Sequence, residues 1–254
     1  MNQVLEIDER RQLARVRASV RWGDLMEALQ AHRLMPRVYP GGAACSTVGE
    51  FVAQDGVGVG SFQYGSIGGN IVSSRPLEVT LKLQPLAPMQ AVVAVFNRPA
   101  DIEIGLADVA RMELPLWSVS LLDRSAVDLH ARLEGDEFEL PTGRYAALFS
   151  YRGGDRLTVL PRLRGAVLAA GGRLLAAPGC HTRWLERFTG LASLGVTPVP
   201  SQCRVPLGEL SGVLHAIPAE VRRKLAFEGV VADTARCVKL RFFLLEGALA
   251  LSNA

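Results

Sequence analysis

Apolar and polar residues alternate in two short stretches at the start of the chain. These stretches are residues 4–8 and 13–16, and the polar residues 9–11 between them suit a turn, so the pattern predicts a β-hairpin. From Trp22 the apolar period becomes helical, which predicts an amphipathic helix that ends before the proline and glycine cluster at 36–42.

Regular patterning resumes after residue 75. An alternating strand is expected at 77–83, and Pro85 and Pro88 mark a boundary, so we expect one domain at 1–88 and a second at 89–254. The second domain has two successive β-α-β patterns, which favours a split β-α-β, ferredoxin-like arrangement and an α+β fold. Its expected strands are 91–96, 116–122, 145–151, 173–177, 202–205 and 237–245, and its expected helices are 100–112, 124–133, 157–170, 184–188 and 207–215.

Composition narrows the class of protein. The chain has 254 residues, of which 49% are hydrophobic and 21% charged, so a sizeable core is available. The net charge of +3 is spread along the chain, so no nucleic-acid partner is expected. No apolar run is long enough for a membrane span, and residues 1–11 are too polar for a signal peptide, so we expect a cytoplasmic location.

The four cysteines lie far apart and form no C-x-x-C pair. They are Cys45, Cys180, Cys203 and Cys237. Neither a disulfide framework nor a metal site is expected from this spacing, and reduced structural thiols are the simpler interpretation.

One segment, residues 41–69, carries nine glycines and is called the glycine segment below. Glycine at this density weakens regular structure, and it suits backbone that takes positive φ or that approaches a ligand closely. The segment contains neither a G-x-G-x-x-G fingerprint between a strand and a helix nor a P-loop. It is therefore either an anion-binding backbone loop or a glycine-rich turn region of a β-domain.

The order of short motifs through this region resembles the flavin domain of the FAD-linked oxidases. This family includes vanillyl-alcohol oxidase, p-cresol methylhydroxylase, D-lactate dehydrogenases and the FAD-binding subunit of glycolate oxidase. The motifs are Trp22-Gly-Asp-Leu25, Pro40-Gly-Gly, Ser46-Thr-Val-Gly49, Gly56-x-Gly58-x-Gly60-Ser61, Tyr64-Gly65, Asn70-x-Val72 and Glu78 to Pro85. Residues beyond 89 are similar to the family's cap domain, through Trp184-x-x-Arg187-Phe188 and Val205-Pro206.

The resemblance implies FAD as the cofactor and a partial p-cresol methylhydroxylase-type FAD-binding domain followed by the cap. It also implies a set of backbone contacts to the flavin ring and pyrophosphate, with Val72 near the adenosine. The implied cofactor-binding residues are Pro40, Gly41, Gly42, Ser46, Thr47, Val48, Gly49, Ala53, Gly56, Gly58, Gly60, Ser61, Tyr64, Gly65 and Val72.

Three departures from the family pattern accompany these matches. The chain opens in the middle of the expected flavin domain, and residues 70–74 join 75–78 directly where the family carries further strands. Glu50 stands where the family usually has a second glycine. We therefore expect a second copy of the chain or a separate subunit to complete the FAD site.

No catalytic residue is assigned by the sequence. A flavin oxidoreductase needs a group that takes a proton and a positive centre for a carboxylate, since the cofactor performs the redox step. His181, His215 and Arg241 are candidates in the second domain, and no residue matches a metal-binding histidine cluster or a histidine that tethers FAD.

Three hypotheses follow. The first is an FAD-dependent oxidoreductase, or the FAD-binding subunit of one, that oxidises a small hydroxy acid or alcohol by hydride transfer to the flavin. The second is a cofactor-free derivative of the fold that acts as a scaffold or regulatory subunit. The third is a protein that binds FMN or a nucleotide fragment through the remaining loop.

Overall fold

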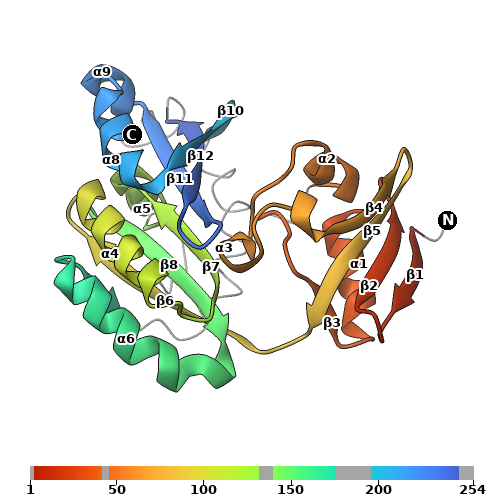
Figure 1. The fold of residues 1–254 in the computed structure, drawn as a ribbon. Helices are drawn as coiled ribbons and strands as arrows, with labels where there is room; N and C mark the ends of the chain where they lie inside the picture. Colours follow the sequence, from red (N-terminus) through yellow and green to blue (C-terminus); the bar gives the residue numbers. More distant parts are fainter. Residues whose placement is uncertain (1–2, 42–45, 132–139, 176–195, 246–254) are drawn as a thin grey trace.

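The computed structural model describes residues 3–41, 46–131, 140–175 and 196–245. They form two antiparallel sheets that lie side by side, with the short helix α3 (Ser61–Tyr64) between them (Figure 1). The chain crosses from the first sheet to the second between Pro85 and Met89. This crossing lies at the proposed boundary between domains 1–88 and 89–254, and the predicted α+β class with antiparallel sheets is confirmed.

The first sheet has the strand order β1-β2-β5-β3, and β4 also pairs with β5. Its strands are β1 (Val4–Asp8), β2 (Leu13–Arg17), β3 (Leu34–Pro36), β4 (Ile71–Arg75) and β5 (Glu78–Pro85). Besides α3, its helices are α1 (Trp22–Gln30), α2 (Val48–Ala53) and a 3-10 turn at Gly68–Asn70. The predicted hairpin and the predicted helix from Trp22 are confirmed. α1 buries Trp22, Leu25 and Leu29 in the core of this sheet, as its apolar face requires.

The second sheet has the strand order β10-β12-β11-β7-β8-β6-β9. Its strands are β6 (Met89–Phe96), β7 (Leu116–Leu122), β8 (Tyr145–Arg152), β9 (Arg173–Leu175), β10 (Thr197–Pro206), β11 (Leu225–Ala232) and β12 (Cys237–Leu244). Its helices are α4 (Pro99–Arg111), α5 (Arg124–His130), α6 (Arg156–Ala169), α8 (Leu210–Ala216) and α9 (Ala219–Arg222), with 3-10 turns at Gly153–Asp155 and Leu207–Glu209. The antiparallel order β7-β8-β6-β9, with α4 after β6 and α6 after β8, is the expected split β-α-β arrangement.

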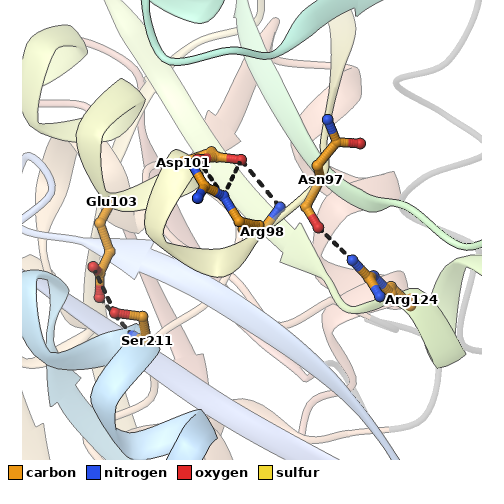
Figure 2. Close-up of polar contacts among 6 residues, drawn as sticks. All are labelled: Asn97, Arg98, Asp101, Glu103, Arg124 and Ser211. Atoms are coloured by element: carbon orange, nitrogen blue, oxygen red, sulfur yellow. Dashed lines mark hydrogen bonds and ion pairs between the residues drawn. The ribbon is translucent and has the colours of Figure 1, made fainter.

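Helices cover the two faces of the second sheet unequally. α4, α6 and α8 pack on one face around the largest apolar core, whereas α5 packs on part of the other face. Glu103 joins α4 to α8, because its carboxylate accepts hydrogen bonds from the Ser211 N–H (2.6 Å) and the Ser211 hydroxyl (2.9 Å) (Figure 2). On the opposite face, α5 is the one described helix whose side chains join the buried cluster.

The sequence did not predict every element of the second sheet. β11 is a central strand that the sequence analysis did not predict, although it pairs with both β7 and β12. The expected helix at 184–188 and the last residues of the expected strand at 173–177 lie outside the described residues.

A buried carboxylate begins α5. Asp123 is 8% exposed and is the N-cap residue, and its Oδ1 accepts hydrogen bonds from the N–H groups of Ala126 (2.8 Å) and Phe227 (3.1 Å). Burial raises the pKa of Asp123 to about 7, against the opposing effect of these two N–H groups.

This raised pKa predicts a specific pH dependence of stability. Between about pH 4 and about pH 7 folded Asp123 holds a proton that the unfolded chain releases, so the free energy of unfolding falls as pH rises, by at most about 1.4 kcal/mol per pH unit. Asp123→Asn keeps the acceptor oxygen and cannot ionise, so its stability relative to wild type is expected to increase across this range. Denaturant unfolding at about pH 5, 6, 7 and 8 measures the difference. Asp24→Asn, at an exposed site on α1, is the control, and an Asp123→Asn curve parallel to wild type would contradict the expectation.

Candidate functional site

The glycine segment attaches the first sheet to the second through α3. The carbonyl of Ser61 accepts the N–H of Asp233 (3.1 Å), and the carbonyl of Phe62 accepts the N–H of Thr234 (2.9 Å). Both donors belong to the turn between β11 and β12. Phe62 is 2% exposed and lies in the apolar core of the second sheet, so the junction is a packed interface as well as a hydrogen-bonded one.

The turn that receives α3 is conformationally unusual. Asp233, Thr234 and Ala235 have φ angles of 52°, 52° and 66°, which is the left-handed region that residues other than glycine seldom enter. Three successive residues of this kind persist only where neighbouring contacts hold them, and the two hydrogen bonds to α3 supply such contacts.

A second connection joins Trp117 of β7 to the residues before the glycine segment. Its indole Nε1 donates to the Arg37 carbonyl (3.0 Å), and its ring lies 5.7 Å from the Tyr39 ring, centroid to centroid. Tyr39 and Val59 exchange backbone hydrogen bonds, N to O, of 3.1 and 2.8 Å. These contacts hold residues 37–39 and 59–60 directly against the second sheet.

Several glycines of the segment are required by these internal contacts. A Cβ on Gly58 would lie 2.2 Å from the Tyr39 carbonyl oxygen, and one on Gly56 would lie 2.3 Å from the Phe51 ring. A Cβ on Gly60 would lie 2.0 Å from the Arg37 carbonyl oxygen, and this glycine also has a φ of +91°. At these three positions the chain approaches itself, which accounts for glycine without any ligand.

Backbone N–H groups of the segment are also used inside the protein. The N–H groups of Val48 and Gly49 donate to the carbonyls of Val20 (2.9 Å) and Ala18 (2.7 Å), and the Gly58 N–H donates to the Ser61 hydroxyl (2.9 Å). An anion-binding nest needs N–H groups that point to a ligand. These three groups are not available for that purpose.

Glu50 has a structural task at the start of α2. Its carboxylate accepts the Thr47 N–H (2.8 Å) and its own N–H donates to the Thr47 hydroxyl (3.3 Å), which together form a capping box. The Thr47 N–H lowers the pKa of Glu50, so the exposed carboxylate is held in its ionised form. The glycine-to-glutamate departure is therefore explained locally by helix capping.

Two polar atoms beside the glycine segment have no hydrogen-bond partner among the described residues. The Trp22 Nε1 and the Ser46 hydroxyl are both buried. The two residues are adjacent in the fold, because the backbone N–H of Trp22 donates to the backbone carbonyl of Ser46 (3.2 Å). Buried polar atoms are nearly always hydrogen-bonded, so this pair is a candidate contact point for a bound molecule.

The structure brings most of the sequence-predicted cofactor residues into one region but leaves two apart. Residues 46–49 precede and begin α2, and residues 56–65 form the loop and α3 beside the second sheet. Ala53 is exposed at the end of α2, and Val72 is 54% exposed on β4. Gly42 lies outside the described residues, while Pro40 is buried and Gly41 partly buried just before it.

The second sheet carries a buried polar cluster on the face that α5 partly covers. The sequence analysis named only one of its residues, Arg241, as a candidate. The strand registers place its members on one face, since Ser118 pairs with Ser150, Ser120 with Val230, and Glu228 with both Leu122 and Arg241. Ser118, Ser120, Ser150 and Glu228 are each at most 5% exposed. Burial also lowers the pKa of Arg241. This set, Ser118, Ser120, Ser150, Glu228 and Arg241, is called the polar face below.

A residue of β10, an edge strand of the second sheet, joins the glycine segment to the side of the sheet that carries the polar face. Arg204 of β10 pairs with Lys239 and thus shares the side of Arg241. Its guanidinium donates to the Asp55 carbonyl (2.8 Å) and to the Asp55 carboxylate (3.1 Å). The pKa of Asp55 is lowered by the Ser66 hydroxyl and, to a lesser extent, by Arg204. The candidate site is therefore the junction of two surfaces, the glycine segment and the polar face.

The other candidate residues lie elsewhere. His215 lies on α8, which packs on the opposite face of the sheet, and its Nδ1 is 2.7 Å from the Ser211 carbonyl oxygen. His181 lies outside the described residues. Within the ranges the structure describes, no three His, Cys, Asp or Glu side chains gather in a metal-binding arrangement, and Cys203 and Cys237 are free thiols.

A family model matches the first part of the chain. Residues 1–78 match a family model described as an FAD binding domain. A search of curated protein sequences finds no match. The resemblance to FAD-linked oxidases is confirmed for this first part of the chain, and the match indicates FAD as its cofactor.

Solved structures extend the fold to nearly the whole chain. An alkyldihydroxyacetonephosphate synthase is similar with a TM-score of 0.76 at 14% identity, covering 96% of this chain and 60% of that one. The 4-ethylphenol oxidase from Gulosibacter chungangensis, in an isoeugenol complex, is similar with a TM-score of 0.68 at 14% identity, covering 96% and 64%. This chain thus spans about 60% of the length of these proteins, whose shared fold it adopts. Among the described helices, none has the length and apolarity that crossing a bilayer requires.

The described residues fit FAD only in part. The unpartnered Trp22 Nε1 and Ser46 hydroxyl fit contact with a bound cofactor. In contrast, the N–H groups of Val48, Gly49 and Gly58 serve the protein itself, and the space beside Gly58 and Gly60 is filled by its own backbone. No pyrophosphate cradle is formed by these positions alone.

Substitution of Gly60 separates a packing role from a cofactor role. Gly60→Ala is expected to lower the free energy of unfolding of the cofactor-free protein by about 2 kcal/mol or more, because its Cβ would meet the Arg37 carbonyl at a left-handed φ. Gly165→Ala on α6, where a Cβ meets nothing within 4 Å, is the control and is expected to be neutral or stabilising by at most about 1 kcal/mol. Denaturant unfolding checks both. Unchanged stability of Gly60→Ala together with lost flavin binding would instead assign the glycine to the cofactor.

Proposed function

We propose that this chain is an FAD-dependent oxidoreductase, or the FAD-binding subunit of one, that oxidises a small hydroxy acid or alcohol. The observation that carries the proposal is the junction itself, where a segment of FAD-binding-domain sequence meets a buried polar face on a second sheet. FAD supplies the hydride acceptor in such chemistry. The chain's own residues would bind and orient the substrate.

Arg241 is our candidate for the positive centre. It lies directly opposite Glu228 in the β11–β12 pair, on the polar face. An arginine in a water-poor site binds a carboxylate through two parallel hydrogen bonds. Glu228 and the serines of the polar face would hold the substrate hydroxyl, and we assign the proton acceptor to none of them individually.

The remaining part of the cofactor site would come from another chain. The N–H groups of Val48, Gly49 and Gly58 serve the protein itself, and β4 is an edge strand with residues 72–75 exposed. A second copy or a separate subunit that covers this edge would supply further contacts to FAD. This assembly and a cytoplasmic location remain predictions.

A cofactor-free role is the alternative that a specific observation favours. The glycines at 56, 58 and 60 are needed by the fold itself, so their presence does not argue that a ligand is still bound. A scaffold or regulatory subunit with the same fold would keep them. Synthase and oxidase are both names of proteins with this fold, so the fold alone does not choose the reaction.

The absorption spectrum of the purified full chain tests the cofactor. We expect flavin bands, either at once or after addition of FAD, and release of FAD on denaturation. Ser46→Ala is expected to weaken FAD binding about 5–30-fold, because it removes a buried hydroxyl next to Trp22. Ser19→Ala, at an exposed site of the same domain, is the matched control. Equal thermal shifts with FMN and FAD would favour the smaller ligand, and a colourless protein that takes up neither would favour the cofactor-free role.

Substitution of Arg241 tests the substrate class. With a hydroxy-acid substrate, Arg241→Met is expected to raise KM about 10–100-fold, since a charged hydrogen-bond partner of the carboxylate is lost. With a simple alcohol the KM should change little. Steady-state kinetics on both substrates, with circular dichroism to verify folding, measure the contrast. Equal losses on both substrates would show that Arg241 does not recognise a carboxylate.

A further inference from the structure

A hollow lies at the end of the second sheet farthest from the glycine segment. Trp117, which contacts that segment, is near the start of β7, and Asp123 and Arg124 directly follow its last residue. At about 3.3 Å per residue the two ends of β7 are roughly 20 Å apart. The hollow is therefore at the opposite end of β7 from the glycine segment. Its lining residues Phe227 and Phe242 are chain neighbours of Glu228 and Arg241 but face the other side of the sheet, so the inference does not depend on the function proposed for the polar face.

The hollow consists of two adjoining cavities of about 410 and 440 Å³. Arg124, Tyr145, Leu214 and Arg222 line both of them, and the hollow is called the distal arginine cavity below. Each volume falls in the usual range for small-molecule sites, about 300–1,000 Å³. The segment after β6, the start of β8 and helices α8 and α9 enclose it.

The wall of the distal arginine cavity is strongly basic. Arg223 joins Arg124 and Arg222 in one cavity, and Arg98 joins them in the other. Arg98 is already paired, since its guanidinium binds the Asp101 carboxylate at 2.7 Å (Figure 2). The other three arginines have no ion pair with any carboxylate in the ranges that the structure describes.

Hydrogen bonds from two of these arginines hold them in place without neutralising them. Arg124 donates to the Asn97 carbonyl, as Figure 2 shows, and its guanidinium carbon lies 5.1 Å from the centre of the Tyr145 ring. Arg222 donates to the Leu214 carbonyl at 3.4 Å. Neutral partners position a guanidinium and leave its charge for a ligand.

Asp123 is the one acid among the described lining residues, and it does not neutralise the arginines either. Asp123 is 8% exposed, and its Oδ1 is occupied by the N–H groups of Ala126 and Phe227. Burial raises the pKa of Asp123 to about 7, so the carboxyl is uncharged in a large fraction of molecules near neutral pH. The net charge of the wall is therefore positive.

The floor of the cavity is apolar. Leu214 and Phe227 are buried, Ile217, Leu225 and Phe242 are partly buried, and the Phe227 and Phe242 rings lie 6.3 Å apart, centroid to centroid. A basic rim over an apolar floor matches a ligand with one anionic group and an apolar body.

We infer that the distal arginine cavity binds a small organic anion, with its carboxylate or phosphate group held by Arg124, Arg222 and Arg223 and its apolar part on the floor of leucine and phenylalanine side chains. Both head groups match the guanidinium fork. The experiment distinguishes them.

Calorimetric titration of the full chain with octanoate, octyl phosphate, inorganic phosphate and 1-octanol tests the inference. Saturable binding of octanoate or octyl phosphate is expected, and the tighter of the two identifies the head group. Arg124→Gln/Arg222→Gln is expected to weaken that binding at least 10-fold. Arg164→Gln, an exposed arginine of α6 outside the cavity, removes a charge as well and is expected to change binding less than twofold.

A single substitution tests the inference even if the double variant does not fold. Arg223 has no side-chain hydrogen bond among the described residues, so Arg223→Gln is expected to leave the melting temperature unchanged and to weaken binding about threefold or more. Binding of 1-octanol as tight as that of octanoate would overturn the inference, because the arginines would then recognise nothing. Absence of saturable binding by either amphiphilic anion, or equal weakening by Arg164→Gln, would overturn it as well.

Discussion

The docking of α3 onto the turn between β11 and β12 is the constraint on which the arrangement of the two sheets depends. Two backbone hydrogen bonds fix Ser61 and Phe62 to Asp233 and Thr234, and the side chain of Phe62 is buried in the core of the other sheet. Because backbone groups make the bonds, no side chain has to be specified for them. What must be specified is a chain path that lets α3 reach the turn, and the glycines before α3 provide it.

The path of this loop gives a structural reason for glycines in the glycine segment. Gly58 and Gly60 allow the loop to run within van der Waals contact of the carbonyls of Tyr39 and Arg37, and Trp117 closes the contact from the second sheet. A glycine allows the backbone to approach either a ligand or another part of the protein's own backbone. Composition alone does not distinguish these two cases. Here the geometry assigns three glycines to the protein. A contact to a ligand is indicated instead by a tryptophan and a serine, whose buried polar atoms have no described partner.

The sequence predicted elements well where one face is apolar and the other polar. The hairpin of β1 and β2 and helix α1 carry such a period, and both are present. β11 was missed because a central strand is buried on both faces, so Leu225 to Ala232 shows no alternation. In the sequence, Glu228 looks like a charged residue that ends an apolar strand, although it lies within β11 on the polar face.

The polar face was missed for a related reason. Ser118, Ser150 and Glu228 come from three strands that are far apart in sequence, and only the registers of β7, β8 and β11 bring them together. No local pattern marks such a set, because each member is an ordinary polar residue in an apolar strand. Arg241 was a candidate by residue type alone, and its pairing opposite Glu228 gives that candidate a location.

The two ends of the second sheet have opposite chemical characters, and the direction of the strands explains why. β7 and β11 are antiparallel, so the end of β11 meets the start of β7 at the junction with α3, while the end of β7 meets the start of β11 at the distal arginine cavity. At the junction, backbone groups and a buried tryptophan dominate, which suits a fixed interface. At the far end, Arg124 at the start of α5 and Arg222 at the end of α9 have backbone carbonyls as their described partners, whereas Arg98 after β6 is paired with Asp101. Three positive charges around one cavity repel one another, and a bound anion offsets that repulsion. The same sheet can therefore hold the flavin half at one end and recognise a different molecule at the other.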